Sequence, residues 1–326
     1  MSGFKRPIER HLMLFSGRAY PELAEEVAEL METELVPTRA LSYANSEIYV
    51  RFEESVRGCD AYVIQSHCAP VNEWLMEQLI MVDALKRASA KRITVVAPFY
   101  PYARQDKKHA GREPVSARLV ADLYKTAGAD RIMSVDLHAA QIQGFFDGPV
   151  DHLWSMPVLT DYVGRKYAQD NNLTVVSPDA GRVRVADMWT DRLDAPLAII
   201  HKRRDPNVAN EVEVHEVVGE VEGRVCLLVD DMIDTAGTIC QAAEALKAHG
   251  AKTVIAAATH PVLSGPAAQR LNDSPFEEVI VTNTLPINTD VEIRNLTVLS
   301  IAPLIAAAIH EVFEDGSVTS LFDGQP

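Results

Sequence analysis

Ten short runs of mostly apolar, often β-branched residues recur along the chain, and amphipathic stretches separate them. The runs are 11–16, 60–66, 92–98, 131–137, 173–177, 196–201, 224–230, 253–259, 278–282 and 296–301. A strand that reads as a continuous apolar run is buried on both faces, as in a parallel sheet covered by helices. The sequence therefore predicts an α/β fold with mostly parallel sheets.

The alternation of strands and helices occurs twice in 326 residues, a length that suggests two domains. Helical spacing is clearest over Val71–Arg87. The segment Gly148–Asp151 follows one predicted strand and precedes a helix near Met156. We predict the boundary there, with two similar doubly wound domains at 1–152 and 153–303, the first completed by the segment 304–326.

The chain is acidic, with 46 Asp and Glu against 31 Lys and Arg and a formal net charge of −15. Such a field repels nucleic acid and anionic membranes, so neither is an expected partner. The apolar stretches at 12–15 and 299–309 are too short for a signal peptide or a membrane span. The four cysteines form no C-x-x-C pair and match no common zinc spacing. We expect a soluble cytoplasmic protein with free thiols.

The most informative motif lies at the end of the run 224–230. Asp230 and Asp231 are followed by Asp234-Thr235-Ala236-Gly237-Thr238 and by a predicted helix at 239–249. Small and hydroxyl residues at a helix N-terminus can direct backbone N–H groups at a phosphate, and the helix end adds partial positive charge. Adjacent carboxylates can accept hydrogen bonds from sugar hydroxyls. Asp234 alone could be a simple N-cap, but the whole motif favours a site for a phosphorylated ribose.

Two motifs carry a resemblance to a known family. The 230–238 loop resembles the phosphoribosyl-binding loop of type I phosphoribosyltransferases and of 5-phosphoribosyl 1-diphosphate synthetases. Residues 136–151, DLHAAQIQGFFDGPVD, are similar at all sixteen positions to the signature of those synthetases, also called ribose-phosphate diphosphokinases. A neutral imidazole such as that of His138, after a predicted strand, can bind a metal.

The resemblance implies a type I phosphoribosyltransferase-like fold and a diphosphokinase reaction. The diphosphoryl group of ATP would pass to the anomeric hydroxyl of ribose 5-phosphate with Mg²⁺, giving AMP and 5-phosphoribosyl 1-diphosphate for nucleotide, histidine and tryptophan biosynthesis. It also implies a homo-oligomer, a hexamer in the family, with ATP sites completed across a subunit interface. The segment 316–322 resembles part of a regulatory phosphate/ADP site in one class of the family.

Two segments of the first domain resemble the ATP-binding segments of the family. The stretch 99–112 carries four Lys or Arg in nine residues, which on an acidic protein fits a nucleotide triphosphate. The resemblance assigns ATP contacts to Arg104 and Gln105 there. The stretch 42–50 resembles a Phe-x-Asn/Asp-Gly-Glu segment that helps hold adenine, which carries over to Tyr43, Asn45, Ser46 and Glu47. Tyr43 and Ser46 replace the commoner Phe and Gly, and the chain has no Walker A loop.

Two segments of the second domain resemble the diphosphate loop and the catalytic loop of the family. Backbone N–H groups of 177–182 could bind a diphosphate, and Asp179 could reach a metal together with His138. Arg182 stands where the family usually has a second glycine. By the resemblance, Lys202 is the catalytic lysine and Arg204 contacts substrate phosphates, at the start of a loop and β-ribbon over 205–223.

Two alternatives use the same loop differently. A phosphoribosyltransferase would bind its sugar at 230–238 but should lack the 136–151 signature and the nucleotide motifs. A regulatory homologue would join the oligomer without turnover, and it should have lost the catalytic loop. The 136–151 signature, the nucleotide motifs and the catalytic loop are all present, so the sequence favours the diphosphokinase.

Overall fold

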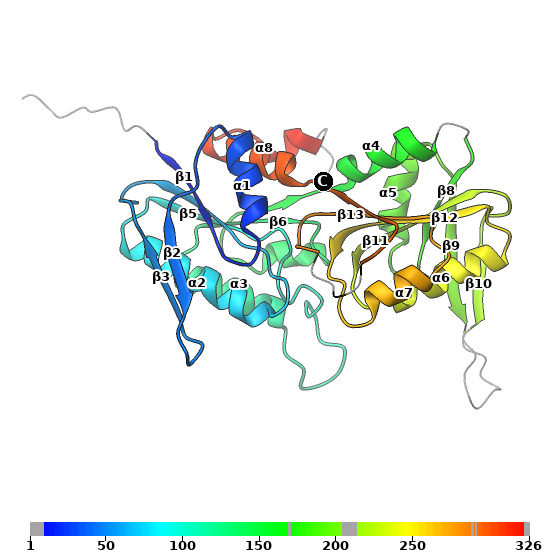
Figure 1. Ribbon diagram of the computed structural model, residues 1–326, viewed down its shortest axis with the longest axis horizontal. Helices are drawn as coiled ribbons and strands as arrows, with labels where there is room; N and C mark the ends of the chain where they lie inside the picture. The colour runs from blue at the N-terminus through cyan, green and yellow to red at the C-terminus, as the bar shows by residue number, and fades with distance from the viewer. Residues whose placement is uncertain (1–9, 169–170, 204–213, 288–289, 291, 323–326) are drawn as a thin grey trace, which may run out of the picture. The chain divides into compact units, whose positions relative to one another are not determined.

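The computed structural model describes residues 10–168, 171–203, 214–287, 290 and 292–322. Contacts within the chain divide it into two compact units (Figure 1). Unit 1 is Met1–Leu153 with Ala302–Pro326, and unit 2 is Trp154–Ile301. The divisions fall within two residues of the expected boundaries at 152/153 and 303/304.

The sheet of unit 1 has the order β1-β4-β5-β6-β7, and each neighbouring pair is parallel. Its strands are β1 (Leu12–Ser16), β4 (Asp60–Ile64), β5 (Arg92–Val96), β6 (Arg131–Val135) and β7 (Val150–Leu153). The sequence did not predict β7, because Asp151 and His152 make this short edge strand polar. The segment taken as a domain boundary is therefore the last strand of the first sheet.

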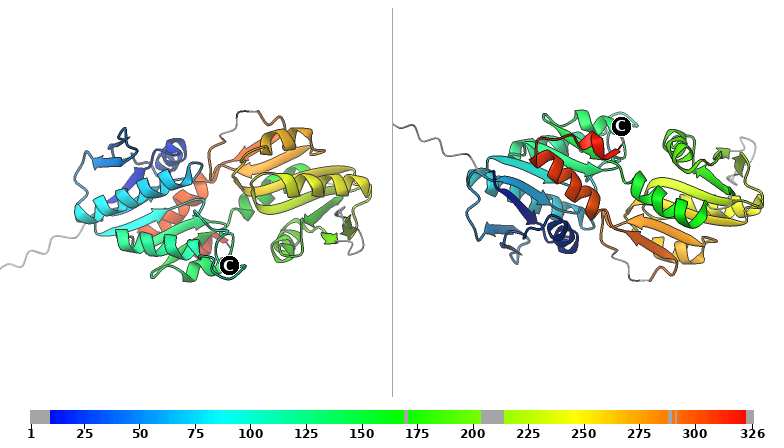
Figure 2. Two further views of the ribbon diagram at one scale, coloured as in Figure 1. Left: turned by 90° about the horizontal axis from the view of Figure 1, so that it is seen from below. Right: turned by 90° about the horizontal axis from the view of Figure 1, so that it is seen from above.

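Helices cover both faces of this sheet (Figure 2). On one face α1 (Pro21–Leu30) packs against α8 (Ala302–Phe313), and on the other α2 (Val71–Arg87) packs against α3 (Ser116–Ala127). The bounds of α2 are those predicted. Unit 1 also contains the antiparallel hairpin of β2 (Thr38–Ser42) and β3 (Ile48–Phe52), with the 3₁₀ turns η1 (Ala140–Gly144) and η2 (Val318–Phe322).

The sheet of unit 2 has the order β10-β9-β8-β11-β12-β13-β14. Only the edge pair β9–β10 is antiparallel among these strands. The bounds are β8 (Leu173–Ser177), β9 (Leu197–Arg203), β10 (Val214–Val218), β11 (Val225–Ile233), β12 (Thr253–Pro261), β13 (Glu278–Thr282) and β14 (Leu296–Leu299). The mostly parallel α/β fold predicted from the apolar runs is confirmed.

Alternate residues of the central strands enter two separate cores. Cys226 and Leu228 of β11 pack with α6 (Gly237–Ala248) and α7 (Ala267–Asp273), whereas Leu227 and Val229 pack with α4 (Met156–Tyr167) and α5 (Val183–Leu193). All four side chains are at most 1% exposed. Period-two alternation explains why both faces of this strand are apolar.

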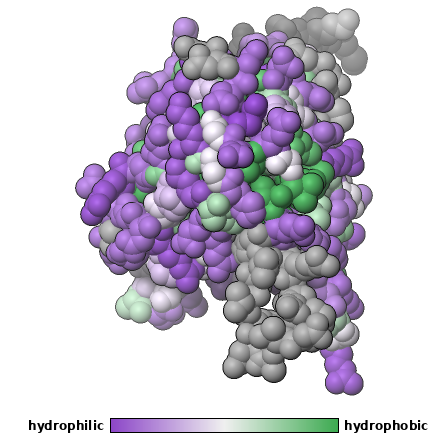
Figure 3. All heavy atoms as spheres, turned by 90° about the vertical axis from the view of Figure 1, so that its right-hand side faces the viewer, coloured by the Kyte–Doolittle hydropathy of each residue, from purple (hydrophilic) through white to green (hydrophobic). Residues whose placement is uncertain are grey.

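The helices of the described ranges include none that is long and apolar enough to cross a membrane. The face of the molecule drawn in Figure 3 is predominantly hydrophilic. The four cysteines are free thiols, and burial raises the pKa of Cys59, Cys226 and Cys240 to about 11. These three thiols are therefore protonated at neutral pH.

Candidate active site

The two adjacent carboxylates of unit 2 lie inside a strand and not beyond its end. β11 continues to Ile233, because β12 continues alongside it: Asp230 is opposite Ala258 and Met232 is opposite His260. The sequence placed the strand end at Asp230, since apolar residues give way to acids there. Strand pairing on this side thus fixes the backbone at Asp230 and directly after Asp231.

The predicted phosphate loop consists of Asp234, Thr235 and Ala236, and α6 begins directly after it. Ala236 is the N-cap, with φ 60°, so the chain turns sharply into the helix. Gly237 and Thr238 lie in the first turn of α6, where the sequence predicted loop. The first four N–H groups of a helix have no partner within it, which makes this end of α6 suitable for a phosphate.

Residues of the turn after β12 and of α7 hold this loop by hydrogen bonds. The N–H of Ser264 donates to the carbonyl of Asp234 (3.1 Å), and its hydroxyl donates to the Asp234 carboxylate. Arg270 of α7 donates from Nη1 to the carbonyl of Thr235 (2.9 Å). A Cβ on Gly237 would lie 3.2 Å from that Nη1, so glycine leaves room for the guanidinium. Sequence reasoning missed Arg270, because it lies 32 residues beyond the end of the motif and no local pattern marks it.

Arg182, at the N-terminus of α5, forms ion pairs with both adjacent acids. Its Nη2 lies 2.5 Å from Oδ1 of Asp231, and its Nε lies 3.3 Å from Oδ1 of Asp230. Burial and the neighbouring Asp231 raise the pKa of Asp230 well above its usual range, and Arg182 opposes this. Two carboxylates this close in a buried place share a proton unless a cation compensates them.

Asp179 organises the loop between β8 and α5. Its Oδ1 accepts hydrogen bonds from the N–H groups of Gly181 (2.7 Å) and Arg182 (3.1 Å), and the Ser177 hydroxyl donates to its carbonyl (2.7 Å). The side chain expected at a metal therefore also caps its own loop, which fixes the backbone that carries Arg182.

The predicted catalytic lysine lies at the end of β9. The backbone of Lys202 is paired with His215 of β10. The β-ribbon therefore forms between β9 and β10, whereas the sequence placed it within 205–223. Arg204, and the part of the loop that continues to residue 213, fall outside the described residues. The roles of Lys202 and Arg204 stay predictions.

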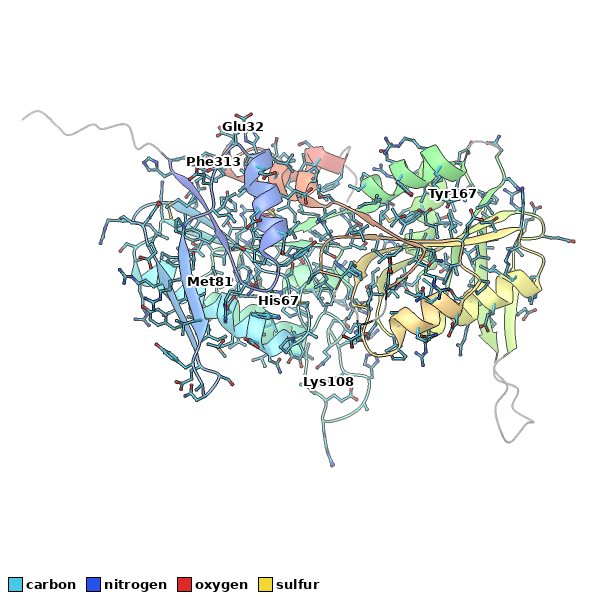
Figure 4. The ribbon with its side chains drawn as sticks, in the orientation of Figure 1. Glu32, His67, Met81, Lys108, Tyr167 and Phe313 are labelled. Atoms are coloured by element: carbon cyan, nitrogen blue, oxygen red, sulfur yellow. The ribbon has the colours of Figure 1, made fainter. Side chains whose placement is uncertain are left out.

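In unit 1, the basic segment 99–112 follows β5 as a long loop, with Lys108 toward its outer end (Figure 4). Arg104 and Gln105 are both exposed. The Gln105 carbonyl accepts from Ala117 (3.1 Å) and its side chain accepts from the Ser116 hydroxyl (2.6 Å), which ties the loop to the start of α3. The predicted ATP contacts thus stand at the surface on an anchored turn.

The base of this loop rests on a buried polar cluster. Nδ1 of His67 lies 3.2 Å from the Phe99 carbonyl oxygen, and Nε2 lies 3.2 Å from the Tyr124 hydroxyl, which donates to Gln78 (2.7 Å). Burial lowers the pKa of His67 to about 4, so the ring is neutral at physiological pH. The cluster positions the loop and is not exposed to a ligand.

The predicted adenine segment forms the tip of the β2–β3 hairpin. Tyr43 N–H donates to the Glu47 carbonyl and Ser46 N–H to the Tyr43 carbonyl (2.8 Å each). Tyr43, Asn45, Ser46 and Glu47 are all exposed, and the Tyr43 ring is in edge contact with Tyr49. Figure 1 shows the hairpin tip and the loop that follows β5 as separate projections of unit 1.

The family-like segment 136–151 follows β6, and His138 is half-buried there. The Leu137 N–H donates to Nε2 of His152 (2.9 Å), so β7 holds the segment in place. Asp136 has φ 37°, an uncommon value for a residue with a side chain. His138 belongs to unit 1 and Asp179 to unit 2, and their joint binding of a metal stays a prediction. Nowhere in the described ranges do three or more His, Cys, Asp or Glu residues gather as a metal site.

Comparison with known proteins identifies the family. The protein-family model for the N-terminal domain of ribose phosphate pyrophosphokinase matches residues 12–128. The family model for the phosphoribosyl synthetase-associated domain matches residues 206–323. A ribose-phosphate pyrophosphokinase of Streptomyces avermitilis is 69% identical over 325 residues, 100% of both chains. One of Mycobacterium tuberculosis is 65% identical over 316 residues, 97% of both chains.

A solved structure agrees with these relatives. The crystal structure of phosphoribosylpyrophosphate synthetase from Mycobacterium smegmatis superposes with a TM-score of 0.89 at 63% identity, covering 94% of this chain and 100% of that one. Fold, motifs and relatives agree over nearly the whole length. The chain belongs to the ribose-phosphate pyrophosphokinase family, the transferases that form phosphoribosyl pyrophosphate from ribose 5-phosphate and ATP.

Proposed function

We propose that unit 2 of this enzyme binds ribose 5-phosphate in the segment from Asp230 to Thr238. The observation that carries this assignment is the order of three features along the chain. β11 contains the two adjacent acids, a three-residue loop follows β11, and α6 begins directly after the loop. The 5-phosphate would accept hydrogen bonds from the N–H groups and hydroxyls of Asp234–Thr238. Asp230 and Asp231 would accept hydrogen bonds from the ribose hydroxyls.

The other substrate is ATP, and we assign its contacts to unit 1. Arg104 and Gln105 would bind ATP from the 99–112 loop, and the hairpin residues Tyr43, Asn45, Ser46 and Glu47 would hold the adenine. The anomeric hydroxyl of the sugar attacks the β-phosphorus of ATP, the bond to the α-phosphate oxygen breaks, and AMP leaves. This chemistry depends mainly on positioning and charge neutralisation. Lys202 and Arg204 would stabilise the transferring group, and Arg204 would also contact the phosphate of the sugar.

The transfer needs a metal ion, which we propose is Mg²⁺ held by His138 and Asp179. Mg²⁺ in such enzymes binds one or two carboxylates together with substrate phosphates and water, and the Asp179 carboxylate fits that donor set. The family resemblance adds the His138 imidazole. Oδ1 of Asp179 is engaged with its own loop, which leaves Oδ2 as the oxygen for a metal. When bound, the ion neutralises phosphate charge.

We also propose that the chain acts as a homo-oligomer, with a hexamer as the expected form, in the cytoplasm. Three large apolar side chains of α2 and α3 support a contact between copies: Met76 is 52% exposed, Leu119 57% and Leu123 38%. Leu119 and Leu123 are four residues apart and share one helix face. Sedimentation analysis of the purified protein tests the oligomer.

The reaction is tested by ³¹P NMR of the protein with ATP, ribose 5-phosphate, Mg²⁺ and phosphate. AMP together with a sugar-linked diphosphate is the expected result. ADP with a sugar bisphosphate would mean attack at the γ-phosphorus. No turnover with ribose 5-phosphate still bound would identify a regulatory homologue.

A further inference from the structure

The side chain of Arg182 occupies a position from which it reaches both sugar-site acids. It is 18% exposed, and Asp230 and Asp231 are 23% and 9% exposed at their side chains. Its own N–H is held by Asp179, so the side chain leaves the backbone from a fixed point. A planar guanidinium with several donors suits a contact with two carboxylates at once.

The acids need such a partner because they crowd each other. Besides the Arg182 pair, Oδ1 of Asp230 accepts only one further hydrogen bond that is resolved in the described part of the chain, from the N–H of Asp231 (2.8 Å). Like charges in a half-buried place disfavour ionisation of both groups, which is why the pKa of Asp230 is raised. A protonated carboxylic acid has less capacity to accept hydrogen bonds from two sugar hydroxyls.

The charged groups around the pair come from few elements. The strand β12 presents Ala258 opposite Asp230, and the nearest ionisable residue on β12 is the buried His260, bonded to Thr284 (2.9 Å). The first turn of α6 has no acidic residue. On the α5 side, Asp179 is engaged with backbone N–H groups. Arg182 is therefore a cation in ion-pair contact with both acids.

We propose that Arg182 is a positioning residue for the sugar: it keeps Asp230 and Asp231 ionised side by side and so ready to bind the ribose hydroxyls. This rests on the proposed sugar site. Without Arg182, Asp230 and Asp231 share a proton up to a higher pH than in the parent protein. As the pH falls, the variant therefore loses sugar binding before the parent does.

The test uses the full-length enzyme and three variants: Arg182→Gln, Arg182→Lys and, as a matched control, Arg184→Gln. Arg184 is exposed on the same helix, two residues away. The kcat, the KM for ribose 5-phosphate and its Kd by calorimetry are measured from about pH 9 to about pH 6. Thermal unfolding of each variant checks that it is folded.

For Arg182→Gln we expect the KM and Kd to rise about 10-fold or more near neutral pH, with a rise that steepens as the pH falls. The kcat at saturating sugar should change much less. Arg182→Lys should recover most of the affinity, and Arg184→Gln should match the parent. An Arg182→Gln enzyme with the parent KM and pH profile, or with tighter binding, would overturn the proposal.

Failure of the proposed function would look different. In that case the parent enzyme itself would not bind ribose 5-phosphate in calorimetry or form a sugar diphosphate in the NMR assay. A parent enzyme that binds and turns over, with an unaffected Arg182→Gln variant, would leave the function intact and remove only the role of Arg182.

Discussion

Ser46 has a φ of 70° at the tip of the β2–β3 hairpin, in the left-handed region that glycine enters at least cost. We expect Ser46→Gly to raise the free energy of unfolding by up to about 1 kcal/mol, because relief of strain exceeds the added entropy of the unfolded chain. Chemical denaturation measures this, with Ser46→Ala as the control that keeps the strain. A Gly variant no more stable than the Ala variant would contradict it.

Lys202 is the residue whose loss should affect chemistry most. We expect Lys202→Ala to lower kcat by about 100-fold or more, because a cation near the transferring phosphates acts mainly in the transition state. The Kd for ribose 5-phosphate should change little, since other residues bind the sugar. Stopped assays and calorimetry on this variant and on Lys252→Ala, an exposed lysine elsewhere in unit 2, measure both quantities. Unchanged turnover would remove the assigned role.

At the scale of elements, Glu278 links three parts of unit 2 at the start of β13. It accepts hydrogen bonds from Tyr162 (2.7 Å), Lys166 (3.0 Å) and Tyr167 (2.6 Å) of α4 and from Thr297 (2.5 Å) of β14. Burial alone would raise the pKa of Glu278, but these hydrogen bonds outweigh it and hold the pKa at about 2. The carboxylate form therefore stabilises the fold.

We expect Glu278→Gln to lower the free energy of unfolding at pH 7 by about 1–2 kcal/mol. The expected loss is small because Lys166 is half-exposed and water screens its ion pair with Glu278. A lowered pKa means that the stabilisation is fully present above the unfolded pKa of about 4.3 and is lost as the pH falls toward 2. The variant and the parent should thus converge in acid. Unfolding curves between pH 7 and pH 2 measure the difference, with exposed Glu277→Gln as the control. A difference in unfolding free energy between parent and variant that stays constant across this pH range would contradict the prediction.

The sequence predicted those elements whose residues carry their own signal. All ten apolar runs are strands, α2 has the predicted bounds, and the predicted family is confirmed. The hairpin strands and β7 were missed because they are half-exposed or polar, so neither apolar runs nor clear alternation mark them. β11 is longer than predicted because its pairing with β12 outweighs the polarity of Asp230 and Asp231.

The candidate site was predictable where one motif holds it and not where distant segments meet. The segment Asp234–Thr238 is continuous in sequence, whereas Arg270, which contacts it, lies 32 residues beyond its end. Arg182 was noted as a departure from the family pattern, but its ion pairs with Asp230 and Asp231 depend on a tertiary contact between the N-terminus of α5 and β11. The roles assigned to single residues at the site stay predictions.

On the scale of the whole molecule, unit 1 is built from both ends of the chain. Ile305 and Ile309 of α8 are fully buried, and Asp315 pairs with Arg10 (2.7 Å) and Arg92 (3.3 Å). We expect a fragment 1–153 to show no cooperative thermal unfolding, because loss of two buried isoleucines alone removes about 3–6 kcal/mol from a typical total of about 5–15. Circular dichroism measures this.

The matched fragment joins residues 302–326 to 1–153 through a Gly/Ser linker, and it should regain a cooperative transition. Equal melting of the two fragments would show that α8 is dispensable. A fragment 154–301, which holds all of unit 2, should fold by itself.

The return of α8 to the first sheet also sets an order of events during protein synthesis. When residue 301 has left the ribosome, unit 2 has every strand and helix it needs, whereas the earlier-made unit 1 still lacks a helix. Unit 2, although it is translated second, can therefore fold first. Unit 1, although it is translated first, must wait for residues 302–326, so a ribosome that stops before them releases a chain with an exposed N-terminal core.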